Sequence, residues 1–165
     1  MIVEQGELTD GQWDELRAGE EHPWGSDGLE WRRKERLLLL RVGGRLVAMA
    51  GWSIVGIEAG GETFDVVGLG AVVVSRPHRG KGYARGVLEP WLERAATLGP
   101  ARAALFCAPH NEGLYARLGF ARVAASVIAD QPAGPVTMPG TFMWRPLHAG
   151  ATWPDGPVRV RGLPF

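Results

Sequence analysis

The sequence predicts a mixed α/β fold in which a mostly antiparallel central sheet of six to seven strands is flanked by helices on both faces. Three observations lead to this prediction. Runs of apolar and β-branched residues separated by glycine turns indicate several strands in succession. Two segments with apolar residues at helical spacing, 82–98 and 111–118, interrupt the later strands. The sequence shows neither an internal repeat nor a linker, so we expect one domain over residues 1–165.

The N-terminal part begins with a predicted helix over residues 9–18. Thr9 is a typical helix-capping residue, and the apolar side chains that follow share one face. The next segment, 19–31, is rich in turn residues but contains Trp24 and Trp31. Large aromatic side chains in a loop usually cover either the core or a ligand.

Three predicted strands follow this loop. Segments 36–42 and 45–57 are joined by Gly43-Gly44 and should form a hairpin. After a second glycine turn at 60–61, the segment 63–74 becomes apolar on both faces. This pattern is typical of a central strand that is covered on both sides.

The clearest helix covers residues 82–98 and ends at Gly99-Pro100. A short helix at 111–118 has Asn111 as its expected N-cap. The remaining predicted elements are strands at 102–108, 120–129 and 141–147 and an apolar, Pro- and Gly-punctuated tail at 148–165, which we expect to pack on the domain.

Composition narrows the class of protein. The chain has 165 residues, 45% apolar and 22% charged, which is typical of a soluble globular protein. Its N-terminus lacks the pattern of a signal peptide, and its apolar runs are too short to span a membrane, so we expect a cytoplasmic protein. The single cysteine, Cys107, excludes an intrachain disulfide and a cysteine-rich zinc site. We expect Cys107 to be a buried, unreactive thiol, and we expect no metal cofactor.

Charge is balanced overall but unevenly distributed. The formal net charge is zero, so nothing indicates a nucleic acid partner, and we expect no membrane partner either. Residues 1–30 hold nine of the 18 acidic residues and one basic residue, whereas residues 76–122 hold eight basic residues and three acidic ones. The two segments either form opposite walls of a cleft or are unrelated solvated surfaces.

A glycine-rich turn between the strand 63–74 and the helix 82–98 is the strongest functional motif. Gly80 and Gly82 leave the backbone N–H groups accessible at the positive end of the helix dipole, an arrangement that binds phosphate. The motif fits neither a nucleoside triphosphate loop nor a dinucleotide fingerprint, because the lysine is not followed by Ser or Thr and a third glycine is missing from its place. A plain strand-to-helix turn with solvated bases is the structural alternative.

The same turn resembles a family signature. The run "RGKGYA", 79–84, is similar to the Arg/Gln-x-x-Gly-x-Gly/Ala signature of the GCN5-related N-acetyltransferases, and "NEGLYARLGF", 111–120, is similar to a second conserved helix of that family. The two occur in the family's order, and the resemblance covers roughly residues 1–147. Within the family, the sequence looks most similar to the aminoglycoside 2'-N-acetyltransferase branch. The resemblance implies the acyl-CoA N-acyltransferase fold.

The resemblance also implies roles for individual residues. The family transfers an acetyl group from acetyl-CoA, its co-substrate, directly to an amine. Tyr115 would protonate the departing thiolate, and the Val72 N–H would stabilise the oxyanion. Leu114 and Leu118 should be buried against the sheet while Tyr115 points away from them. The residues implied in coenzyme A binding are Val72, Val73, Val74, Arg79, Gly80, Lys81, Gly82, Tyr83, Ala84, Arg85 and Asn111, and those suggested near the acceptor are Trp24, Trp31, Glu30 and Phe165.

The general base is missing from its expected place. In the relatives that carry a carboxylate on the fourth strand, the resemblance places it where this chain has Gly70. Substitutes that the sequence leaves open are Glu58, Glu62, Asp65, Glu30, a backbone-bound water and the Phe165 carboxylate.

Three functions therefore remain open at the level of sequence. The first is acetyl transfer to a primary amine of a small molecule, aminoglycoside-like because the acidic N-terminal third suits a polycation. The second is acetyl transfer to a protein or peptide amine. The third is a non-catalytic acyl-CoA-binding module, suggested by Gly70. A homodimer is left open.

Overall fold

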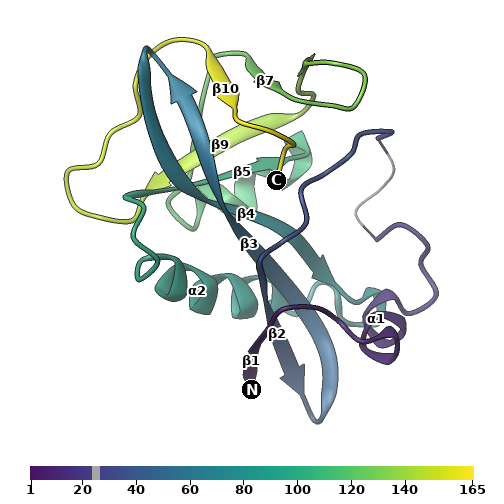
Figure 1. Ribbon diagram of the computed structural model, residues 1–165. Helices are drawn as coiled ribbons and strands as arrows, with labels where there is room; N and C mark the ends of the chain where they lie inside the picture. Colours follow the sequence, from purple (N-terminus) through teal and green to yellow (C-terminus); the bar gives the residue numbers. More distant parts are fainter. Residues whose placement is uncertain (24–26) are drawn as a thin grey trace.

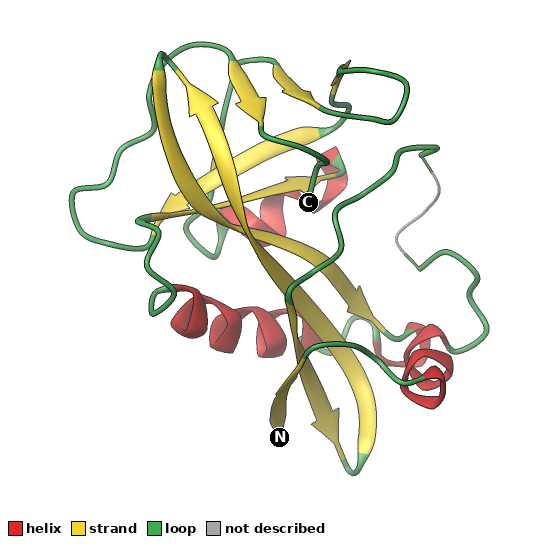
Figure 2. Cartoon of the chain, viewed as in Figure 1, coloured by secondary structure: helices red, strands yellow, loops and turns green. Residues whose placement is uncertain are grey.

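In the computed structural model, which describes residues 1–23 and 27–165, the chain forms a curved mixed sheet with few helices (Figures 1 and 2). Seven of its nine strand pairings are antiparallel and two are parallel. This architecture confirms the predicted fold class. The described residues contain ten strands where six to seven were predicted, because four of them are only two or three residues long and carry no periodic signal.

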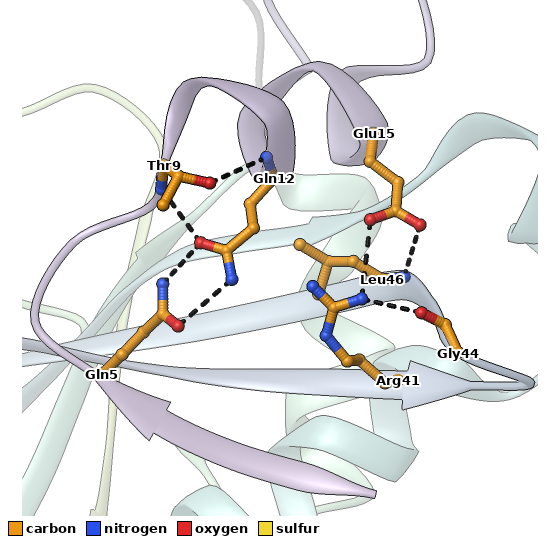
Figure 3. A network of polar contacts seen from close by, with 7 residues as sticks. All are labelled: Gln5, Thr9, Gln12, Glu15, Arg41, Gly44 and Leu46. Carbon is orange, nitrogen blue, oxygen red and sulfur yellow. Dashed lines mark hydrogen bonds and ion pairs between the residues drawn. The ribbon is translucent and has the colours of Figure 1, made fainter.

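The N-terminal part consists of β1 (Ile2–Gln5) and α1 (Asp10–Arg17). Thr9 caps α1 as predicted, accepting a hydrogen bond from the Gln12 N–H while the Gln12 side chain accepts one from the Thr9 N–H (Figure 3). Glu15 of the same helix accepts a hydrogen bond from the Leu46 N–H and pairs with Arg41 (Figure 3). These bonds attach α1 to the following hairpin.

Three long strands form the centre of the sheet. β2 (Arg36–Val42), β3 (Arg45–Ala59) and β4 (Glu62–Val74) are consecutive antiparallel neighbours joined by the predicted glycine turns. A 3₁₀ turn (Arg76–His78) then leads into α2 (Tyr83–Ala95), which crosses over to β5 (Arg102–Cys107). β5 pairs in parallel with β4. The start of α2 therefore follows the end of the central strand β4 after the 3₁₀ turn and the glycine-rich loop.

The C-terminal part completes the sheet with short elements. These are a 3₁₀ turn (Pro109–Asn111), α3 (Glu112–Ala116), β6 (Ala121–Arg122), β7 (Val127–Ala129), β8 (Val136–Thr137), β9 (Thr141–Pro146) and β10 (Val158–Val160). The main path of the sheet is β6-β9-β5-β4-β3-β10-β7-β8, and β2 and β1 extend it beside the other end of β3. The tail strand β10 therefore lies inside the sheet, between β3 and β7.

Successive side chains along the strands point to opposite faces of the sheet and form separate apolar clusters on the two faces. Leu38 and Leu40 of β2 join the cluster under α2 and α3, whereas Leu37 and Leu39 join the cluster under α1. A third cluster contains Phe165 of the tail together with residues of β3, β4, β7, β9 and β10. Helices thus cover both faces of the sheet, α2 and α3 on one and α1 on the other.

Of two local predictions around α3, one is confirmed in position only and one is wrong. Asn111 is the N-cap residue of α3, but its side chain makes no capping bond, and its N–H bonds to Ala108 O of the preceding 3₁₀ turn. Tyr115 does not point away from the core: it is 7% exposed, while Leu114 and Leu118 are half-buried. The helix is only five residues long, so the expected stripe four residues apart does not form.

None of the helices in the described part of the chain is both long and apolar enough to span a membrane.

Candidate active site

The site begins where β4 and β5 separate. Only Val67, Gly68 and Leu69 of β4 pair with β5, although β4 continues to Val74 (Figure 1). From Gly70 onward, β4 therefore has no strand partner on its β5 side among the described residues. An extended ligand could hydrogen-bond to this free edge in the manner of an added strand.

A β-bulge lies at the start of this free edge. Two residues of β4, Ala71 and Val72, face the single Ala50 of β3, because the register shifts between Met49 and Gly51. Ala71 has a φ of 51°, a left-handed conformation that is uncommon for a residue with a side chain. Such bulges re-aim the backbone locally and are frequent next to active sites. Val72, the predicted oxyanion donor, belongs to this bulge.

The glycine-rich turn forms an anion cradle at the start of α2. Gly82 is the N-cap of α2, and Gly80 lies two residues before it. Both have a positive φ, 81° for Gly82 and 75° for Gly80. Among the described residues, the N–H groups from Gly80 to Arg85 have no acceptor, and the first helical bond runs from Gly86 N–H to Gly82 O. A Cβ on Gly80 or Gly82 would meet no atom within 4 Å, so the space in front of the loop is open. These N–H groups can hold a pyrophosphate.

The basic side chains of the loop play different parts. Arg79 donates to Val74 O and forms a two-bond ion pair with Glu20, so it fixes the loop to the end of β4 and to the segment after α1. Arg85 pairs with Glu89 on the exposed surface of α2. Lys81 is exposed and has no ion-pair partner in the described part of the chain. Lys81 is therefore the loop cation that is best placed to meet a phosphate.

Tyr115 lies in the apolar cluster that also holds Val72, Val74 and Tyr83. Burial raises the pKa of Tyr115 well above its ordinary value, with the neighbouring Cys107 contributing, so the phenol stays protonated at physiological pH. A protonated hydroxyl is suited to protonate a leaving group. Asn111 is exposed one residue before α3, and the structure shows no contact of its side chain in this site.

Cys107 at the end of β5 is half-buried, and burial together with Glu112 raises its pKa to about 11. A thiol with a raised pKa is a poor nucleophile at neutral pH, in agreement with the expectation from sequence.

The opposite face of the opening is aromatic. The Trp31 ring lies edge-on to Phe106 of β5 at 5.9 Å between ring centroids, and Phe106 contacts Phe165 at 5.2 Å. Phe165 is 2% exposed, and its ring fills the space beside Gly68 of β4. Glu30 is fixed through its backbone, which exchanges hydrogen bonds with the Gln131 side chain. Trp24, predicted near the acceptor, lies outside the described residues.

A cavity of about 460 Å³ borders this aromatic group. Phe106 lines it together with the segments 122–127 and 138–142, and Arg122 is the only charged residue among its described lining. The cavity therefore offers no carboxylate for a cationic ligand.

Lys34 occupies the place that Gly70 leaves empty. A Cβ built on Gly70 would lie 2.8 Å from Lys34 Nζ and 3.1 Å from the carbonyl carbon of Phe165. Burial, with the positive charge of Arg32 nearby, lowers the pKa of Lys34 to about 8. Reasoning from sequence missed this residue, although one signal was available: the chain has only two lysines, Lys34 and Lys81, among its 18 basic residues.

Three of the carboxylates considered as substitutes for the base lie far from the site. Glu62 and Asp65 are eight and five residues before Gly70 on β4, which places them roughly 26 and 16 Å away at the rise of an extended strand. Glu58 pairs with Thr63 in the same remote part of the sheet and forms an ion pair with Arg161.

More than half of the carboxylates in the acidic segment 1–30 are neutralised by ion pairs. Five of the nine are paired with basic residues of the fold, namely Glu4 with Arg36 and Arg94, Glu7 with Arg33, Asp14 with Arg17, Glu15 with Arg41 and Glu20 with Arg79. The described residues also contain no cluster of three or more His, Cys, Asp or Glu side chains that could hold a metal ion.

Comparison with known proteins identifies the class of protein that this fold and site define. The sequence model of the acetyltransferase (GNAT) family matches residues 6–120, more than half of the chain. The chain therefore belongs to the GNAT family of acetyltransferases. No curated protein matches its sequence.

Solved structures show the same fold. A GNAT family N-acetyltransferase (YhbS) from Escherichia coli, solved in complex with CoA, aligns with a TM-score of 0.60 at 21% identity, covering 97% of this chain and 89% of that one. A GNAT family acetyltransferase from Brucella melitensis, solved with acetyl-CoA, aligns with a TM-score of 0.58 at 17% identity over 96% and 94% of the two chains. The ribosomal-protein-S18-alanine N-acetyltransferase from Escherichia coli aligns with a TM-score of 0.57 at 15% identity over 93% and 100%.

Proposed function

We propose that this protein is an acetyl-CoA-dependent N-acetyltransferase that moves an acetyl group directly to a primary amine of a small molecule. One observation carries the proposal: the N–H groups of residues 80–85, which have no acceptor among the described residues, follow the free edge of β4 after one 3₁₀ turn, and Tyr115 lies in the same apolar cluster as Val72 and Val74 of that edge. A pyrophosphate on the loop and an extended pantetheine arm along β4 would bring a thioester to the bulge at Ala71 and Val72.

The residues then have the following roles. The N–H groups from Gly80 to Arg85 hold the pyrophosphate, with Lys81 adding charge. The main chain of Val72–Val74 binds the pantetheine arm, and the Val72 N–H stabilises the oxyanion. Tyr115 protonates the departing thiolate. The aromatic side chains Trp31 and Phe165 line the approach of the acceptor.

A small acceptor is favoured over a protein chain because Phe165 and Trp31 cover the face from which the amine must approach. An aminoglycoside-like acceptor remains a candidate through the sequence resemblance, although five of the nine carboxylates in residues 1–30 that would have favoured a polycation are engaged in ion pairs.

The proposal is tested in two steps. Calorimetry should show that acetyl-CoA binds to the purified protein, and absence of binding would contradict the proposal entirely. Thiol release from acetyl-CoA is then measured with a panel of aminoglycosides, polyamines, amino acids and peptides. Turnover with peptides alone would favour a protein substrate, and binding without turnover by any amine would favour a non-catalytic acyl-CoA-binding module.

A further inference from the structure

Lys34 is held in a defined position beside the opening between β4 and β5. Its Nζ donates to Arg32 O at 3.0 Å. The segment around it is fixed on both sides: Glu35 N–H bonds to Trp52 O of β3, and Arg32 N–H bonds to Pro164 O of the tail. Ser53 of β3 also donates to Arg33 O. Lys34 is therefore presented by an ordered backbone and not by a loose loop.

Two glycines make room for the lysine side chain. Gly51 and Gly70 are register partners on β3 and β4, so their missing side chains leave one continuous gap on the same face of the sheet. The Lys34 stem runs through this gap: a Cβ on Gly51 would meet Lys34 Cγ at 2.7 Å, and one on Gly70 would meet Cε at 2.4 Å. The gap leads the amino group to Gly70, the first residue of the free edge of β4.

The charges around Lys34 are few. β3 and β4 present glycines, and its own segment contributes the positive Arg32. The tail contributes the main-chain carbonyl of Phe165, which belongs to a carboxylate if the chain ends there. Arg32 lowers the pKa of Lys34, whereas such a carboxylate would raise it.

We infer that Lys34 is the catalytic base that removes the proton from the acceptor amine during acetyl transfer. The inference rests on the proposed function, because the thioester then lies at the bulge next to Gly70. Tyr115 belongs to the apolar layer under α2, whereas the alternation along β4 places Lys34 on the other face with Phe165. Lys34 thus approaches the amine nitrogen, and Tyr115 the departing sulfur, from different faces of the sheet.

The reaction balances with these two groups. The amine nitrogen attacks the thioester carbon, a C–N bond forms and the C–S bond breaks. The nitrogen gives one proton to neutral Lys34 Nζ, and the departing sulfur takes one proton from Tyr115 Oη. The Lys34 ammonium then returns its proton to the Tyr115 phenolate through solvent, so that the products are an acetamide and the coenzyme A thiol.

The first test compares Lys34→Arg and Lys34→Met with the wild-type chain, using the amine of the panel with the highest thiol release. Both variants should lower kcat by about 10²–10³-fold while acetyl-CoA affinity stays within about twofold. Wild-type kcat should rise with pH as Lys34 becomes neutral, and this rise should be lost in both variants. Arg33→Met is the matched control, because Arg33 is exposed and pairs with Glu7; it should change nothing.

Lys34→Arg separates a base from an anion-binding cation, because arginine keeps the charge but does not lose its proton. Retention of most of the activity by Lys34→Arg, or the same pH dependence in Lys34→Met and wild type, would overturn the inference. Stable acetylation of Lys34 during turnover, measured by mass spectrometry, would also overturn it, because the lysine would then be an acceptor.

A second experiment introduces a carboxylate on β4 to replace Lys34 as the base. Lys34→Ala removes the two contacts below 3.0 Å that a Cβ at position 70 would make, so Gly70→Glu should be accommodated in that background once the Phe165 carbonyl carbon, at 3.1 Å, shifts by a few tenths of an ångström. The double variant should regain at least about tenfold in kcat over Lys34→Ala. Its pH dependence should move to lower pH, because a glutamate loses its proton near pH 4.3. A double variant as inactive as Lys34→Ala would count against the inference.

Titration of the two lysines by NMR needs no acceptor. In the chain of residues 1–165, Lys81 serves as the exposed internal reference and Lys81→Arg assigns the signals. The pKa of Lys34 should lie at least about one pH unit below the ordinary lysine value of about 10.4. An ordinary pKa of Lys34 in a protein that binds acetyl-CoA would overturn this inference alone, whereas absence of acetyl-CoA binding would overturn the proposed function and this inference with it.

Discussion

Single residues decide what the loop and the opening can bind. Gly82 and Gly80 adopt backbone conformations that L side chains rarely adopt, and the space beside them is open. Gly70 and Gly51 are glycines for another reason, because the Lys34 side chain occupies the room that their side chains would need. Tyr115 is set apart by burial, which keeps its hydroxyl protonated.

Gly82→Val should abolish measurable acetyl-CoA binding. The added side chain strains the loop and projects toward the bound pyrophosphate, so that loss of two charge-assisted hydrogen bonds would weaken binding by at least about 100-fold. Calorimetry measures the affinity. Gly99→Val is the control, because Gly99 also has a positive φ, 108°, and open space but lies after α2. Unchanged binding in Gly82→Val would exclude this loop as the phosphate site.

Tyr115→Phe should lower kcat by about 10²–10³-fold and leave acetyl-CoA affinity within about twofold, because only proton donation is lost. Since burial raises the pKa of Tyr115, its ionisation should cause no loss of wild-type activity on the alkaline side below about pH 10. Steady-state kinetics between pH 6 and 10 measure both effects. A variant with wild-type kcat would show that another group, or water, protonates the thiolate.

Elements supply the geometry that holds these residues. The bulge in β4 is the main irregularity of the central sheet, and it lies where the strand loses its β5 partner. A regular strand would keep Ala71 paired and would leave Val72 on the opposite face. The bulge holds Ala71 in a left-handed backbone conformation, which is strained for a residue with a side chain. This backbone strain lies next to the site.

Ala71→Gly should raise the free energy of unfolding by about 0.5–1 kcal/mol, because glycine adopts a φ of 51° without the Cβ penalty. Ala18→Gly is the matched variant, since Ala18 has a φ of 48° at the end of α1, where glycine is the preferred residue. Urea denaturation measures both. Clear destabilisation by Ala71→Gly alone would mean that the packing of the Ala71 methyl group outweighs the strain.

At the scale of the whole molecule, the tail is part of the sheet. β10 pairs with β3 on one side and β7 on the other, and Val160 is fully buried. The tail also brings Phe165 to Gly68 and Gly70 in the centre of β4. The family match ends at residue 120, so these contacts come from a part of the chain beyond it.

Removal of residues 148–165 should therefore abolish cooperative unfolding, because β7 and β8 lose their connection to β3. Thermal and urea unfolding followed by tryptophan fluorescence measure this. Arg159→Ala provides a control within β10: its ion pair with Asp130 is exposed, so the free energy of unfolding should change by less than about 1 kcal/mol. A truncated chain that unfolds as cooperatively as the full chain would show that the tail is dispensable for the fold.

Local signals in the sequence determined most of the fold. The capped first helix, the glycine turns between the long strands and the periodic helix after Gly82 follow from neighbouring residues, and the structure confirms them. The anion cradle was predicted for the same reason, because a glycine-rich strand-to-helix turn is built from consecutive residues. The short strands β8 and β10 were missed, since they form only where partners elsewhere in the chain supply the hydrogen bonds. The single strand predicted over 120–129 is broken into β6 and β7, which pair with different strands.

The surroundings of Gly70 were decided by the tertiary structure alone. Lys34, Gly51, Gly70 and Phe165 are separated by up to 131 positions, and no local pattern links them. The gap that two glycines open on neighbouring strands becomes a place for a lysine only when the register of β3 and β4 sets them side by side. The sequence by itself determined the elements and the glycine-rich loop before α2, because short-range periodicity and capping encode them. Tertiary packing decided which charged side chains form ion pairs, and it decided that Lys34 lies at Gly70, where relatives carry a carboxylate.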